Sequence, residues 1–203
     1  MKLRSMILNI PFAMAISFSV PAAFGAEIPV TDFSVTENQA FGWRIVDDGV
    51  MGGLSKGKVL MTEEGIMRFN GTLSLENNGG FSSVRTDKVA LDLSASDGLM
   101  IRVKGDGRTY QLRLATDARY RSMEVSFKAD FSTAEGQWQE IKIPFSAFTG
   151  SFRGIELPDE KLDPKKIERL SVLLGDKKPG PFALEMDWIR AYSEPVPDPS
   201  PEK

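Results

Sequence analysis

The fold is decided by the stretch Leu99-Met100-Ile101-Arg102-Val103-Lys104-Gly105-Asp106-Gly107-Arg108-Thr109-Tyr110-Gln111-Leu112-Arg113-Leu114. Apolar side chains occupy every second position on both sides of a glycine-rich centre, a period that is typical of β-strands with one buried face. Because the centre has the composition of a turn, we predict that the two strands pair as a hairpin. Their polar positions would then share one outer face, made of Arg102, Lys104, Gln111 and Arg113.

The same alternation recurs along most of the chain. Further apolar rows lie at Leu73 and Leu75, at Val89, Leu91 and Leu93, at Met123, Val125 and Phe127, at Ile141 and Ile143, at Leu170, Val172 and Leu174, and at Phe182, Leu184 and Met186. Glycine-rich and proline-rich turns separate these rows, which predicts an all-β protein, an antiparallel β-sandwich of jelly-roll type. Helix is expected only as short turns at residues 163–167 and 144–148.

The N-terminus has the pattern of an export signal. Lys2 and Arg4 precede an apolar body, and small residues follow it, so we predict a signal peptide over residues 1–25. An uncleaved membrane anchor is the alternative, since the apolar stretch nearly reaches the length that a spanning helix requires. Cleavage would leave a periplasmic or secreted protein with no stable membrane insertion. We expect one domain over residues 26–193 and a disordered, proline-rich tail over residues 194–203.

Composition removes several classes of function. The chain has no Cys and no His, which excludes thiol and histidine catalysis, disulfides and metal sites that use those ligands. Its formal net charge is −3, so nucleic acid is a poor partner, because phosphate binding needs clustered basic residues. Carboxylates and other oxygen ligands remain available for a hard cation. We predict no cofactor and no metal site.

Two glycine-punctuated runs carry a family resemblance. They are Trp43-Arg44-Ile45-Val46-Asp47-Asp48-Gly49-Val50-Met51-Gly52-Gly53-Leu54-Ser55 and the segment from Phe69 to Arg85 with its Gly79-Gly80-Phe81 break. Gly105 to Tyr110, Trp138 to Phe145, Phe148 to Gly154, and Gly180 to Ile189 follow in order. This order resembles the complex I intermediate-associated protein 30 family, whose domain is a jelly roll similar to galactose-binding and carbohydrate-binding modules. The resemblance implies a non-catalytic, chaperone-like assembly factor with a protein client or partner.

The adjacent carboxylates of Asp47 and Asp48 are candidates for a site or for a turn. Beside glycines they could approach a ligand or hold a cation, but side chains of neighbouring residues on an extended chain point to opposite faces. Alternatively, Arg85 and Arg153 pair with them and make the motif a structural network. An enzyme would need Asp47 or Asp48 to act with Glu124 on a glycosidic bond or a metal.

Trp43 and Trp138 could stack on sugar rings or pack in the core, and Trp188 is equally open. The cationic face predicted above is the preferred partner surface, with a solvated sheet face as the alternative and a glycan as the alternative ligand. The candidate ligand or partner residues are Trp43, Asp47, Asp48, Met51, Ser55, Arg85, Arg102, Lys104, Gln111 and Arg113.

Overall fold

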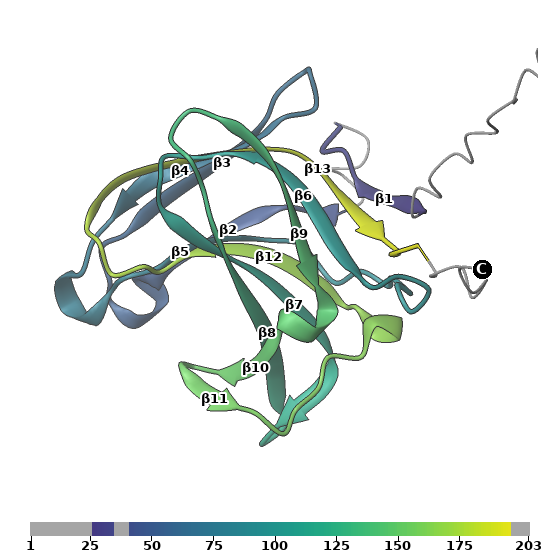
Figure 1. The fold of residues 1–203 in the computed structure, drawn as a ribbon. Helices are drawn as coiled ribbons and strands as arrows, with labels where there is room; N and C mark the ends of the chain where they lie inside the picture. Colours follow the sequence, from purple (N-terminus) through teal and green to yellow (C-terminus); the bar gives the residue numbers. More distant parts are fainter. Residues whose placement is uncertain (1–25, 35–40, 196–203) are drawn as a thin grey trace, which may run out of the picture.

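The computed structural model describes residues 26–34 and 41–195, and these form two antiparallel β-sheets packed face to face (Figure 1). The predicted all-β antiparallel sandwich is confirmed. The predicted signal peptide at residues 1–25 lies outside the described residues, as does most of the predicted tail. Glu194 is described: its backbone N–H donates to Asp97 Oδ2 at 2.7 Å.

One sheet, here called sheet A, has six strands. Their order is β3 (Lys56–Met61), β4 (Met67–Leu73), β13 (Gly180–Tyr192), β6 (Gly98–Lys104) and β9 (Trp138–Pro144), with β1 (Glu27–Thr31) paired to the end of β13. The other, sheet B, has seven. Their order is β11 (Ile155–Leu157), β10 (Thr149–Phe152), β8 (Met123–Ser132), β7 (Thr109–Tyr120), β12 (Arg169–Leu174), β5 (Ser82–Arg85) and β2 (Arg44–Asp47).

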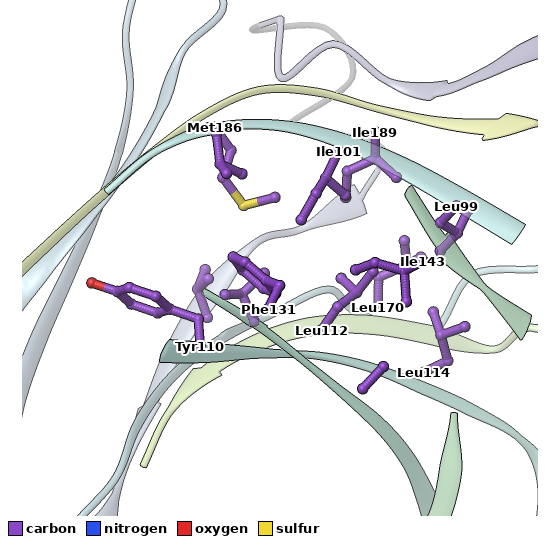
Figure 2. Close-up of a cluster of buried hydrophobic side chains, with 14 of the residues drawn as sticks. Leu99, Ile101, Tyr110, Leu112, Leu114, Phe131, Ile143, Leu170, Met186 and Ile189 are labelled. Atoms are coloured by element: carbon purple, nitrogen blue, oxygen red, sulfur yellow. The ribbon is translucent and has the colours of Figure 1, made fainter. Parts of the chain in front are cut away.

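The core fills the space between the sheets, where the alternating rows of both layers meet (Figure 2). Leu99 and Ile101 of β6 face Leu112 and Leu114 of β7, and Leu170 of β12 lies with them; all five are buried. Alternate residues on each strand point to opposite faces, so burial of these positions sends their polar neighbours outward. The rows at β8 and β9 follow the same rule, and β13 follows it as far as Trp188. In β12 every residue from Leu170 to Leu174 is buried.

The predicted hairpin between the two strands of the deciding stretch is wrong. β6 pairs with β13 and β9 in sheet A, whereas β7 pairs with β8 and β12 in sheet B. Between them the chain crosses the sandwich: Gly105 forms a bridge with Glu135, and Gly107 donates to Thr133 Oγ1 at 3.1 Å. Those contacts replace the tight turn, because both apolar rows must face the same interior from opposite sides.

Two apolar rows also differ from the expectation. Leu75 lies beyond β4 and is exposed, and the segment from Val89 to Leu93 is irregular, with Leu91 making an isolated bridge to Ile167. The short helical turns are confirmed as 3₁₀ helices η3 (Phe145–Ala147) and η4 (Pro164–Lys166). Two more, η1 (Asp48–Met51) and η2 (Glu76–Asn78), occupy the glycine-rich runs. Within the described residues, none of the helical turns is long and apolar enough to cross a membrane.

Candidate functional site

Asp48 lies inside the molecule and joins the two glycine-rich runs. Its side chain is fully buried, and its carboxylate accepts four hydrogen bonds. Ser55 donates from its backbone N–H (3.0 Å) and its Oγ (2.6 Å), while the backbone N–H groups of Gly80 (2.6 Å) and Phe81 (3.2 Å) donate from the other run. Ser55 Oγ in turn accepts from the backbone N–H of Ser74 at 3.0 Å.

One glycine of each pair, Gly53 in the first run and Gly79 in the second, makes room for this carboxylate. A Cβ on Gly53 would lie 2.3 Å from Asp48 Cγ, and one on Gly79 would lie 2.6 Å from Asp48 Oδ2. Burial opposes ionisation of Asp48, but the hydrogen bonds from Ser55, Gly80 and Phe81 outweigh it and hold the pKa of this carboxyl below its ordinary value. Asp48 therefore links the two glycine-rich runs by internal hydrogen bonds, and its carboxylate is not accessible to a ligand.

Asp47 has a similar structural role on the other side of the chain. Its carboxylate accepts from the backbone N–H of Gly57 at 2.9 Å and from Ser82 Oγ at 2.6 Å. The predicted pairing of Arg85 and Arg153 with these carboxylates is wrong, because backbone amides and serine hydroxyls occupy their oxygens. Glu124 lies on β8, within 3.6 Å of Arg169 Nε. The carboxylates proposed for catalysis thus serve separate contacts.

The tryptophans divide between the core and the surface. Trp43 is buried, with ring centroids 5.6 Å from Phe33 and 6.3 Å from Phe41, so it packs in the core and is no ligand platform. Trp188 is buried too, in a small cluster with Met100 and Tyr192. Trp138 is 38% exposed.

Three of the remaining candidates stay at the surface, in two different settings. Met51, at the end of η1, is 65% exposed. Arg102 and Lys104 lie over the exposed Trp138 ring, at 5.5 and 5.2 Å from its centroid.

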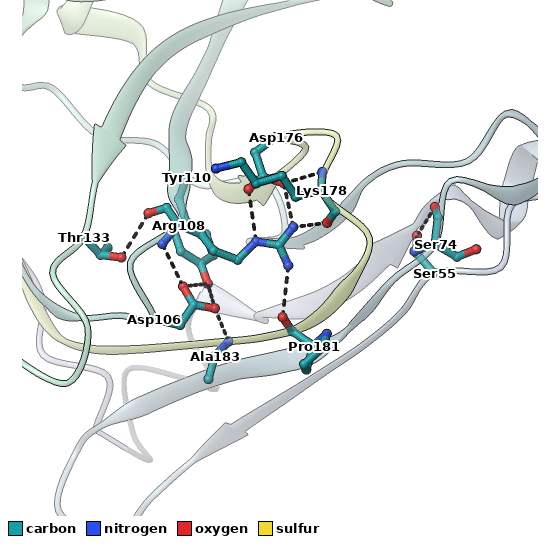
Figure 3. A network of polar contacts seen from close by, with 10 residues as sticks. All are labelled: Ser55, Ser74, Asp106, Arg108, Tyr110, Thr133, Asp176, Lys178, Pro181 and Ala183. Carbon is teal, nitrogen blue, oxygen red and sulfur yellow. Dashed lines mark hydrogen bonds and ion pairs between the residues drawn. The ribbon is translucent and has the colours of Figure 1, made fainter.

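A second polar network explains the motif from Gly105 to Tyr110 (Figure 3). Arg108 makes two contacts with the carboxylate of Asp176, Nε at 3.0 Å and Nη2 at 2.6 Å, and donates to the carbonyls of Lys178 and Pro181. The carboxylate of Asp106 accepts from Tyr110 Oη at 3.1 Å and from the backbone N–H of Ala183 at 2.8 Å. These bonds fix the crossing between the sheets to the start of β13.

The four-residue cationic face is divided between the two sheets. Arg102 and Lys104 lie on the outer face of sheet A, where Arg102 contacts Asp187 (3.1 Å) and Lys104 contacts Glu185 (2.5 Å). Gln111 and Arg113 lie on the outer face of sheet B. No single surface contains all four residues, because β6 and β7 belong to opposite layers.

On sheet B, the strand register builds a different set that includes Arg113. Residues directly opposite one another across six strands form a lateral row on the outer face: Arg44, Arg85, Ser171, Arg113, Lys128 and Thr149. We call this set the basic row. Sequence reasoning named Arg85 and Arg113 separately but missed Lys128 and Ser171, because only the register of distant strands places them side by side.

Arg113 and Arg85 are held in place by neutral partners. Arg113 donates from Nε (2.9 Å) and Nη2 (2.6 Å) to Gln111 Oε1, and Gln111 Nε2 donates to Asp130 Oδ1 at 2.9 Å. Arg85 Nε donates to Ser83 Oγ at 3.1 Å. Burial, and then the charge of Arg85, lowers the pKa of Arg113 to about 10. Burial also lowers the pKa of Arg85, while the negative charge of Glu124 opposes the shift.

Two hollows are present in the described part, and one of them reaches the end of the basic row at Thr149. One hollow of about 410 Å³ is lined by residues between Phe145 and Gly150 and between Pro158 and Leu162. Another, of about 370 Å³, lies between residues 88–92 and 165–168. Across residues 26–34 and 41–195, no three carboxylates come close enough together to hold a metal ion.

The sequence comparisons confirm the family resemblance. A family model described as Complex I intermediate-associated protein 30 matches residues 31–186. The chain is 34% identical over 115 residues to the mitochondrial protein of that name from Mus musculus, covering 54% of this chain and 34% of the relative. It is 24% identical over 174 residues to the Drosophila melanogaster protein, covering 75% of this chain and 59% of the relative. The chain thus spans between about a third and three fifths of these two relatives.

Solved structures share the fold. The family 11 carbohydrate-binding module of Clostridium thermocellum, in complex with a β-1,3-1,4-mixed-linked tetrasaccharide, aligns with a TM-score of 0.62 at 19% identity, over 85% of this chain and 98% of the module. A second structure of a family 11 module, from the cellulase Lic26A-Cel5E of the same organism, gives 0.63 at 18% identity, over 83% and 95%. These values confirm the jelly-roll sandwich.

The predicted periplasmic or secreted location is wrong. The curated relatives from mouse, fly and Caenorhabditis elegans are all named as mitochondrial proteins. The prediction depended on a basic start and an apolar body at residues 1–25. Leaders of several kinds share a basic, acid-poor composition, so this segment alone does not assign a compartment.

Proposed function

Because the chain belongs to the complex I intermediate-associated protein 30 family, we propose that it is a non-catalytic module that binds a protein partner during assembly of complex I. The observation that carries this proposal is the basic row on the outer face of sheet B. It offers long cationic side chains on a rigid sheet, around a central Ser171 that is only 8% exposed. A flat array of this kind suits recognition of a charged protein surface.

The absence of a catalytic role is supported by where the acidic groups lie. Asp48 is buried and Asp47 bonds to Gly57 and Ser82, so neither carboxylate is poised beside a substrate. Catalytic carboxylates need a shared cleft and a proton to move, and Glu124 contacts Arg169 on a separate strand. With no His or Cys in the chain, few groups for general acid or base catalysis remain.

Site-specific photo-cross-linking tests the proposal. A photoreactive amino acid replaces Thr149, which is exposed on the outer face of sheet B, in cells that assemble complex I. The matched control replaces Lys58, which is exposed on the outer face of sheet A. We expect Thr149 to capture a complex I subunit or intermediate and Lys58 to capture none. Equal capture at both positions, or none at either, contradicts the proposal.

A carbohydrate ligand is the second candidate, and Trp138 is the observation that favours it. This ring is exposed on the edge strand β9, where exposed rings can stack on sugars. Two cations already lie over the ring, however, and the basic row contains no aromatic residue. Calorimetry with a β-1,3-1,4-mixed-linked tetrasaccharide separates the candidates. Saturable binding that is lost in Arg113→Ala or Trp138→Ala would support the carbohydrate function.

A further inference from the structure

The arginines at the centre of the basic row lie at a spacing that suits two anionic groups. Arg85 and Arg113 both stand opposite Ser171, from the two strands that flank β12. Neighbouring strands are about 4.8 Å apart, so the two backbones are separated by about 10 Å. The short Ser171 side chain between them leaves the space above the sheet to the two guanidinium groups.

Arg85 and Arg113 form no ion pair within the described residues, unlike their cationic neighbours, and Glu124 and Asp130 act on them only from beyond ion-pair distance. Arg44 contacts Asp87, Lys128 contacts Glu156 at 3.3 Å, and Arg169 contacts Glu124 at 3.6 Å. Throughout residues 26–34 and 41–195, no carboxylate lies within ion-pair distance of Arg85 or Arg113. The hydrogen bonds that hold them go to Ser83 and Gln111, which are neutral.

Such an arrangement is costly without a counter-charge. Both arginines are half-buried, and burial is the main cause that lowers the pKa of each. The charge of Arg85 lowers the pKa of Arg113 further, and the charges of Arg169 and Arg44 lower that of Arg85, against the opposing effects of Asp130 and Glu124. Like charges at short range in a partly desolvated setting repel each other more than they do in water. Gln111, itself bonded to Asp130, also fixes the plane of the Arg113 guanidinium in advance of binding. An incoming anion would find the donors already oriented.

We propose that Arg85 and Arg113 form a two-point site for the carboxylates of an acidic, extended polypeptide segment laid across sheet B. This inference rests on the proposed function, which supplies a protein as the partner. An extended segment presents side chains on one face about 6.8 Å apart, within reach of two flexible arginines. Arginine binds a carboxylate through two parallel hydrogen bonds. Both residues lie on the outer face of sheet B, and within the described residues Nη1 of Arg113 and both Nη atoms of Arg85 donate to no protein group.

The test is a titration of the purified full chain with a ten-residue peptide of alternating Glu and Ser, followed by calorimetry. A peptide of alternating Gln and Ser is the control ligand. We expect saturable binding of the Glu peptide only, weakened about tenfold in Arg113→Gln and in Arg85→Gln, as loss of one charge-assisted hydrogen-bonded pair predicts. The control variant Arg102→Gln removes the same charge from sheet A and should change the affinity less than about twofold.

Several outcomes would overturn the inference. They are equal binding of both peptides, equal weakening by Arg102→Gln, and tighter binding of inorganic phosphate than of the Glu peptide. The peptide comparison on the unmodified chain needs no variant, so a variant that fails to fold does not remove the test. If Thr149 captures a complex I subunit but the Glu peptide does not bind, this inference fails while the proposed function stands. If the Glu peptide binds but Thr149 captures no complex I subunit, the proposed function fails while the two-arginine site for acidic peptides stands.

Discussion

Replacement of Asp48 by Asn tests the hydrogen bonds by which this carboxylate links the two glycine-rich runs. Asn keeps one oxygen, and if this takes the place of Oδ2 it still faces Ser55 Oγ, Gly80 and Phe81. Those three bonds lose their ionic character, at about 1 kcal/mol each, and the amide NH₂ meets the Ser55 N–H, donor against donor. Since such effects are not additive, we expect the free energy of unfolding to fall by about 3 kcal/mol.

Urea unfolding followed by tryptophan fluorescence measures this loss. With a slope of about 2 kcal/mol per molar urea, the midpoint should fall by about 1.5 M. Asp159→Asn, at an exposed position, is the control and should stay within about 0.5 kcal/mol of the parent. The stabilisation comes from a lowered pKa, so it is complete above the unfolded value of about 4 and is lost as the pH falls below it. A loss under about 1 kcal/mol, or a gap that widens in acid, would refute the reasoning.

The other structural contacts give three further predictions. Gly79→Ala places a Cβ 2.6 Å from Asp48 Oδ2 and should destabilise the fold by about 1 to 3 kcal/mol, so an unchanged melting temperature by calorimetry contradicts the tight fit. Arg108→Gln leaves Asp176, whose side chain is 9% exposed, without its ion-pair partner, and should cost about 3 kcal/mol in urea unfolding; a loss below 1 kcal/mol would make the network unimportant. Trp138→Ala should lower stability by only about 1 kcal/mol and leave capture at Thr149 intact, which the same cross-linking assay checks.

The sequence alone could predict which way side chains face, but not which strands pair. Alternation correctly placed Leu112 in the core and Arg113 outside, because the period of two follows from backbone geometry. It could not show that β6 and β7 belong to different sheets, since a short glycine-containing link suits a hairpin and a crossing equally well. That choice depends on contacts made by Thr133 and Glu135, which lie more than twenty residues away.

The candidate site shows the same limit more strongly. The sequence showed Asp48 to be a turn residue. The glycines of both runs also indicated that a side chain packs closely against the backbone there, and this side chain is that of Asp48. The basic row had no such signal. Arg85, Ser171 and Arg113 come from three separate parts of the chain, and one residue of slip in any strand would turn that residue inward.

The motifs that place this chain in its family make contacts inside the protein. Membership of the family therefore says more about the fold than about the partner that the protein binds. Asp48 in the first run is buried, Gly79 makes room for it, and Asp106 and Arg108 tie the sheet crossing to β13. On the outer face of sheet B, Arg44 and Arg85 lie within the two runs, whereas Arg113 and Lys128, the other two cations of the basic row, lie outside them. The charges at Arg113 and Lys128 can therefore change without altering these motifs. A difference in partner between two family members should be sought first at these two positions.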